Sequence, residues 1–185
     1  PTMTPVLLLS LLACGPKAPP QAAAAPPPPV EAPPPPPPPP PAQSVESEGM
    51  KLSWAVDGDR LRCTMSAPGT GWVRVGFNSV RAQHLANMVL GWVDASGAHV
   101  EDRYANDPPF IEPDVALGGT ADVELIGGSE ASGRTTVEFS IPLDSGDAFD
   151  LPLSAGQTVY FILAYGPDDD PKSIAVVRTA VEATL

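Results

Sequence analysis

The side chains best suited to catalysis are few in this chain of 185 residues. It has two histidines, His84 and His99, and four methionines. Copper redox centres use several imidazole and thioether ligands, so two histidines are too few for one. His99 has no Gly-x-Ser-x-Gly segment to pair with, so the sequence shows no Ser-His-Asp arrangement. We therefore predict no catalytic residues and no enzyme activity of the chain's own.

Two groups of aspartates offer hard oxygen ligands of the kind that Ca²⁺ prefers. One group contains Asp144, Asp147 and Asp150, and the other is the run from Asp168 to Asp170. Neither group matches the twelve-residue EF-hand loop with its central Gly and terminal Glu. Aspartate in such segments typically forms local hydrogen bonds in solvated turns. We therefore predict no metal site.

The charge of the chain excludes two classes of partner. Its net charge is −12, from 22 acidic and 10 basic residues. A nucleic-acid backbone would have to be neutralised by a stripe of Lys and Arg, and the sequence shows none. The same negative charge opposes electrostatic binding to anionic lipid, so any membrane attachment is expected to be covalent or hydrophobic.

The first 14 residues have the pattern of a lipoprotein signal segment. The apolar run at 5–13 is far shorter than the roughly 20 residues of a transmembrane helix. It ends in Leu11-Leu12-Ala13-Cys14-Gly15, which resembles the bacterial lipobox, although no Lys or Arg precedes the run. Cys14 is the predicted lipidation site. We expect a lipid-anchored protein of a bacterial cell envelope, at the outer membrane and facing either the periplasm or the exterior.

Residues 15–48 are predicted to form a disordered proline-rich linker. Almost every residue from 16 to 42 is Pro or Ala, with an unbroken proline run at 33–41, and such runs favour an extended polyproline II rod. The tract has too little side-chain variety to set a register for a proline-reading partner. With Cys14 lipidated, Cys63 has no disulfide partner, and its alternation with Leu61 and Met65 predicts a buried, inert thiol.

Residues 49–185 have the alternating pattern of a β protein. Val137, Phe139 and Ile141 lie on one apolar face of a strand, and Asp57-Gly58 is typical of a tight hairpin turn. The pattern predicts an all-β, antiparallel, immunoglobulin-like β-sandwich. We expect roughly nine strands, at 51–56, 60–65, 72–77, 87–93, 99–104, 121–126, 134–141, 158–165 and 173–181.

Five short motifs follow one another along this domain: GWVRVGFN at 71–78, NMVLGWVD at 87–94, DRYA at 102–105, TVEFSIPL at 136–143 and AYG at 164–166. Their order resembles that of the DOMON domain family, and the resemblance covers most of residues 52–181. It is closest to the DOMON domains that accompany dopamine β-monooxygenase-type copper enzymes. The resemblance implies a sandwich with a ligand pocket, in a family whose members bind haem b or are proposed to bind sugars.

Aromatic residues within these motifs are candidates for ligand contacts. Small ligands are usually held by aromatic faces with a few polar groups at the edge. Trp54 and Phe110 offer further aromatic faces, and core packing is the other explanation for the tryptophans. The candidate ligand-binding residues are Trp72, Asn87, Met88, Trp92, Asp102, Arg103, Tyr104 and Tyr165.

Haem is the more specific expectation that the resemblance raises. Haem-binding members take an axial Met from the loop before the second motif and a His from near the last hairpin. In this chain the loop at 79–86 has no Met, although it contains His84 and Met88 lies close by. Residues 171–185 contain neither His nor Met, which leaves Lys172 as the nitrogen ligand on that side. His84, Met88 and Lys172 are therefore the candidate axial ligands.

The sequence predicts a membrane-tethered extracytoplasmic module that binds a small molecule or a sugar. Two alternatives stay open. One is a haem b-binding electron-transfer module with a redox partner protein. The other is a structural or interaction domain of the cell envelope, for which the long spacer alone would suffice.

Overall fold

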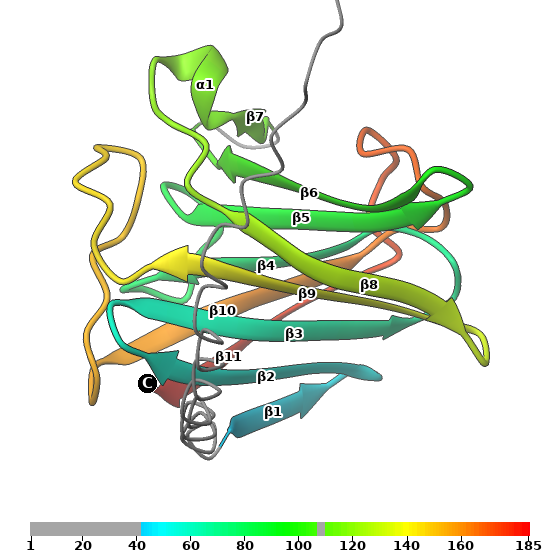
Figure 1. Ribbon diagram of the computed structural model, residues 1–185, viewed down its shortest axis with the longest axis horizontal. Helices are drawn as coiled ribbons and strands as arrows, with labels where there is room; N and C mark the ends of the chain where they lie inside the picture. Colours follow the sequence, from blue (N-terminus) through cyan, green and yellow to red (C-terminus); the bar gives the residue numbers. More distant parts are fainter. Residues whose placement is uncertain (1–41, 107–109) are drawn as a thin grey trace, which may run out of the picture. The chain divides into compact units, whose positions relative to one another are not determined.

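The computed structural model describes residues 42–106 and 110–185. The predicted signal segment, the predicted lipidation site Cys14 and most of the predicted linker lie outside these ranges. The described residues form two antiparallel sheets that pack face to face (Figure 1), so the predicted all-β sandwich is confirmed. Within these ranges, no helix is long and apolar enough to cross a membrane.

The two sheets contain five and six strands. The five-stranded sheet contains, in spatial order, β1 (Gln43–Ser47), β2 (Met50–Asp57), β3 (Arg60–Pro68), β9 (Arg134–Pro142) and β8 (Glu124–Ala131). The six-stranded sheet contains β11 (Val177–Thr184), β10 (Thr158–Tyr165), β4 (Val73–Asn78), β5 (Asn87–Asp94), β6 (Gly97–Tyr104) and β7 (Glu112–Pro113). A short helix, α1 (Asp114–Leu117), follows β7 directly. Each of the nine predicted strands overlaps an observed one, and β1 and β7 are additional.

Strand β1 places the start of the domain before Gly49, within the stretch that the sequence assigned to the linker. It pairs antiparallel with β2, from Gln43 opposite Trp54 to Ser47 opposite Met50. The turn between them contains Glu48 and Gly49, whose φ angles are 51° and 77°, as a tight primed turn requires. Hydrophobic alternation could not reveal this strand, because its side chains are mostly exposed and backbone pairing with β2 orders it.

The core lies between the two sheets and is built from the inward-facing side chains of both. Trp54 of β2 packs against Phe161 of β10 with 4.8 Å between ring centroids, and Phe77 of β4 meets Phe161 edge-on. Cys63 is buried among these side chains, and burial raises the pKa of its thiol, which keeps the thiol protonated. Successive residues of a strand point to opposite faces, so the same strands also present a second set of side chains on the outside of the sandwich.

Candidate functional site

The outer face of the six-stranded sheet carries the first of two candidate sites. In β4, Val75 faces the core, so Arg74 and Gly76 lie on the outer face. Leu90 and Met88 of β5 are their cross-strand partners and share that face. Gly76 makes room for Met88, because a Cβ atom at this position would lie 2.5 Å from Met88 Sδ. The middle of this face is therefore closely packed and largely apolar.

A groove of about 450 Å³ lies between this face and residues 171–175. Trp72 is buried in its floor, and the guanidinium of Arg74 lies 5.2 Å from the centroid of the Trp72 ring. Two lining side chains are largely exposed, Phe110 at 65% and Ile174 at 86%. The lining residues are Trp72, Arg74, Leu90, Arg103, Phe110, Ile111, Pro171, Lys172, Ser173, Ile174, Ala175 and Arg178.

The wall of the groove is fixed to its floor through Trp72. The Trp72 backbone N–H donates to the Asp168 carbonyl over 2.9 Å, and the Gly166 N–H donates to the Trp72 carbonyl over 2.9 Å. A Cβ atom on Gly166 would lie 2.1 Å from the indole Nε1, so this position requires glycine. The groove therefore has a fixed wall as well as a fixed floor, which is typical of a preformed binding site.

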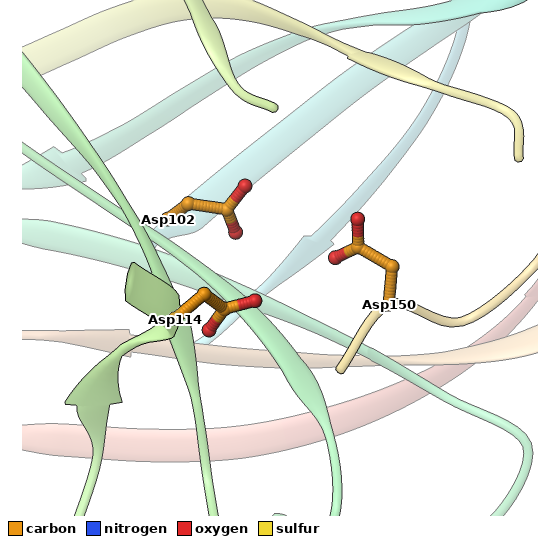
Figure 2. Close-up of side chains that lie close together, drawn as sticks. All are labelled: Asp102, Asp114 and Asp150. Atoms are coloured by element: carbon orange, nitrogen blue, oxygen red, sulfur yellow. The ribbon is translucent and has the colours of Figure 1, made fainter. Parts of the chain in front are cut away.

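The second candidate site is a carboxylate cluster of three aspartates. Asp102 lies in β6, Asp114 is the first residue of α1, and Asp150 lies in the connection between β9 and β10 (Figure 2). One carboxylate oxygen from each lies within 4.8 Å of the others. Asp102 pairs with the core residue Val89 and so lies on the inner face of its sheet. Asp114 is 1% exposed and Asp102 is 6% exposed.

Several oxygens of the carboxylate cluster lack a hydrogen-bond donor. The Asp122 backbone N–H donates to Asp102 Oδ2 over 2.9 Å, and the Asn87 amide donates to Asp150 Oδ1. Within the described residues, both carboxylate oxygens of Asp114, Asp102 Oδ1 and Asn87 Oδ1 are buried without a partner. Buried polar atoms nearly always have a hydrogen-bond partner in folded proteins, so we expect a bound proton or cation at this site.

Burial sets the protonation of the carboxylate cluster. Burial, together with the repulsion of the neighbouring carboxylates, raises the pKa of Asp102 and of Asp114, each to about 7. Burial also raises the pKa of Asp150. Removing a carboxylate from water disfavours its charged form unless a positive charge compensates. Carboxylate and amide oxygens are the ligands that Ca²⁺ prefers, so the cluster has the donors to hold that ion.

The predicted ligand-binding residues are divided between the two faces of the six-stranded sheet. Trp72, Met88, Trp92 and Arg103 lie on the outer face, and Asn87, Asp102, Tyr104 and Tyr165 lie on the inner face. Neighbours along a strand point in opposite directions, which separates Asn87 from Met88 and Asp102 from Arg103. Trp72 and Arg103 line the groove, Asp102 belongs to the carboxylate cluster, and Asn87 donates a hydrogen bond to it at Asp150.

The other predicted residues have packing roles. Met88 is completely buried, and the Trp92 ring stacks on His99 at 4.9 Å between centroids. Tyr104 meets Phe149 edge-on at 5.2 Å. Tyr165 is half-buried and packs against the main core.

The three candidate haem ligands do not converge on the groove. His84 is exposed in the loop at 79–86, and it is not among the described residues that line the groove. Met88 is buried against Gly76, with no exposed surface. Lys172 alone of the three lines the groove. The residues present therefore do not fit a haem held by two axial ligands.

A Ser-His-Asp group does form, at the exposed tip of the β5–β6 hairpin. Asp94 Oδ1 and Ser96 Oγ each lie 3.0 Å from the same atom, His99 Nε2. In a catalytic triad the Ser and the Asp use different ring nitrogens. Hydrogen bonds from Ser96 and His99 hold the pKa of Asp94 well below its usual value. The group therefore has the geometry of a turn cap and not that of an activated nucleophile.

Sequence reasoning missed three residues that matter for the two sites. Arg74 sits at an alternating position where a charged residue usually meets solvent, but it is only 7% exposed. Arg178 reaches the groove from β11, far along the chain. Asp114 follows Pro113 at the start of α1, and an acidic residue in a first helical turn was the only local signal for it. None of the three could be placed without the tertiary fold.

Known proteins resemble this chain over the same domain. A family model described as the DOMON domain matches residues 46–166. The mouse (Mus musculus) "DBH-like monooxygenase protein 2" is 30% identical over 129 residues, which is 68% of this chain and 20% of that protein. The human "Putative DBH-like monooxygenase protein 2" is 34% identical over 103 residues, which is 55% of this chain and 20% of that protein. The chain thus spans about a fifth of the length of these relatives.

Two solved structures share the fold. The cytochrome domain of cellobiose dehydrogenase from Myriococcum thermophilum has a TM-score of 0.55 at 10% identity, over 78% of this chain and 81% of that one. The cytochrome b domain of pyranose dehydrogenase from Coprinopsis cinerea has a TM-score of 0.51 at 17% identity, over 74% and 75%. The motif order and the family match agree, and the resemblance seen in the sequence is confirmed. The chain belongs to the DOMON domain family.

Proposed function

We propose that this DOMON domain is a binding module that holds a small-molecule ligand in the groove on the outer face of its six-stranded sheet. The shape and lining of the groove support this proposal. It has an aromatic floor at Trp72, a fixed wall and two exposed apolar side chains at its rim. Small-ligand sites are typically concave and largely apolar, with a few polar groups. The described lining residues include no His, Cys, Asp or Glu, so we assign binding to the groove and no reaction.

Haem b is the second candidate for this groove, because the two solved structures described above are cytochrome domains. Haem held by two protein ligands needs two donor atoms that converge on the iron. Only Lys172 among the candidates lines the groove, and an ammonium group must lose its proton to bind a metal. The donor set therefore favours a ligand other than haem.

A haemin titration separates these two candidates. We expect the full chain, titrated with haemin under reducing conditions, to give no stoichiometric Soret band, because its ligand candidates do not converge. The ultraviolet–visible spectrum measures this directly. A sharp Soret band with split visible bands would establish the electron-transfer function instead, and its shift or loss in His84→Ala would then identify His84 as a ligand.

We also propose that the carboxylate cluster binds Ca²⁺. The observation in favour is specific: buried oxygens of Asp102, Asp114 and Asn87 have no hydrogen-bond donor in the described part of the chain. A cation at this point would compensate the negative charge and satisfy those oxygens together. The acidic runs in the sequence did not predict this set, because its members come from three separate segments.

The carboxylate cluster and the groove are linked through one short segment. Phe110 and Ile111 line the groove, and Asp114 follows them in the chain. Arg103 Nη1, on the groove side, donates to the Ile111 carbonyl over 3.0 Å. A cation that fixes Asp114 would therefore also restrain this lip of the groove. Ordering a binding surface in advance lowers the entropy cost of binding.

A further inference from the structure

The groove concentrates positive charge in an acidic protein. Arg74, Arg103, Lys172 and Arg178 all line it, which is four of the 10 basic residues in a chain of net charge −12. The described lining residues include no Asp or Glu. Basic residues spread at random over this surface would be outnumbered by acidic ones, so their grouping here calls for a specific explanation.

Most of this positive charge is not compensated by carboxylates in the part of the chain that the structure describes. Arg103 pairs with Glu101 through two hydrogen bonds. In the described ranges, no carboxylate lies within ion-pair distance of Arg74, Lys172 or Arg178. A smaller hollow of about 320 Å³ lies on the five-stranded sheet. Its arginine, Arg62, forms an ion pair with Glu138 over 2.7 Å, so its charge is compensated, unlike that of the groove.

Arg74 is the most constrained of the four. It is 7% exposed. Among the described residues, its one side-chain hydrogen-bond partner is Gln83, whose Oε1 accepts from Nη2 over 3.4 Å, and its Nε is buried without a partner. Burial, Arg178 and Arg103 lower the pKa of Arg74 to about 10, which leaves the guanidinium charged at neutral pH. Stacking on Trp72 accounts for the position of the ring but leaves the charge and the Nε–H donor unmatched.

We infer that the groove takes an anionic ligand with an apolar body, whose carboxylate group binds between Arg74 and Arg178. This inference rests on the proposed function of the groove and names the class of ligand that the groove would bind. A carboxylate would supply the missing acceptors and relieve the repulsion among the guanidinium groups. The apolar body would lie against Trp72 and the exposed side chains of Phe110 and Ile174.

Two matched probes test the charge of the ligand. Isothermal titration calorimetry of the full chain compares 2-naphthoate with 2-naphthamide, which has nearly the same shape but no charge. We expect naphthoate to bind about tenfold more tightly, because hydrogen bonds to a charged partner contribute more than neutral ones. Its affinity is also expected to fall as salt is added, because Lys172 and Arg178 are exposed to the screening ions.

Variants of exposed arginines keep the test independent of folding. Arg178→Gln is expected to remove most of the preference for naphthoate over naphthamide. Arg62→Gln makes the same charge change on the other sheet and is expected to leave that preference unchanged. Equal affinity for the two probes in the unmodified chain would overturn the anionic class and leave the groove as a binding site. Binding of neither probe would instead count against the proposed function of the groove.

Discussion

Addition of Ca²⁺ to the chelator-treated chain is expected to raise its melting temperature by roughly 10 °C when free Ca²⁺ exceeds Kd about 100-fold. A ligand that binds only the folded state at this excess contributes about 2.7 kcal/mol, and each kcal/mol shifts Tm by a few degrees in a domain of this size. The effect arises because the cation compensates the buried carboxylates of Asp102 and Asp114 and the half-buried carboxylate of Asp150. Differential scanning calorimetry with and without chelator measures it.

Amide substitutions provide the controls for this Ca²⁺ effect. Asp114→Asn and Asp102→Asn each remove a charged ligand, so the shift in Tm caused by Ca²⁺ is expected to shrink sharply in both. Asp144→Asn removes an exposed carboxylate outside the cluster and is expected to keep the full shift. A Tm that is the same in Ca²⁺ and in chelator for the unmodified chain would show that the carboxylate cluster is not a Ca²⁺ site.

Without Ca²⁺, the free energy of unfolding is expected to fall by roughly 2 to 4 kcal/mol between pH 5 and pH 8. Asp102 and Asp114 have folded-state pKa values of about 7, above the ordinary aspartate value of 3.8. The folded state therefore holds protons that the unfolded state has already lost. This contribution to stability is fully present below about pH 4 and is lost as the pH rises through about 7.

Urea unfolding at a series of pH values in chelator measures this dependence. Asp147 has the opposite effect on the pH dependence of stability, because N–H donors from Phe149 and Thr120 lower its pKa. It titrates below the pH 5 to 8 window and so does not affect the decline there. Asp114→Asn is expected to make the decline smaller, because Asp102 still titrates in that window, whereas Asp144→Asn is expected to preserve the slope. With Ca²⁺ present the decline is expected to disappear, because the ion stabilises the deprotonated carboxylates. A flat curve for the unmodified chain in chelator would contradict the assignment.

The fold could be predicted from the sequence because period-two alternation and turn residues are local signals. They place nine of the strands, and the motif order identifies the DOMON family. Strand β1 was not predicted, because its side chains are mostly exposed and leave no hydrophobic alternation to detect. Backbone pairing with β2 orders this strand, and the sequence pattern of a single strand does not show which strand it pairs with.

The candidate sites could be predicted only in part, because their residues meet through the fold. The sequence identified four site residues one by one: Trp72, Arg103, Asn87 and Asp102. In the fold they lie on opposite faces of one sheet, the first two at the groove and the last two at the carboxylate cluster. The carboxylate cluster needs α1 and the β9–β10 connection to reach β6. Arg74 lines the groove together with residues 171–175, which come from a distant part of the chain.

The most direct test of the central claim, that the groove on the outer face binds a small molecule, is a nuclear magnetic resonance titration of the ¹⁵N-labelled full chain with 2-naphthoate. The chain has three tryptophans, whose indole N–H signals report on separate places. Trp72 lies in the floor of the groove, whereas Trp54 lies in the core between the sheets. We predict a saturable shift of the Trp72 indole signal and of the backbone signals at 171–178, with the Trp54 signal unmoved. Saturable shifts that map elsewhere, or none up to the solubility of the probe, would contradict the claim.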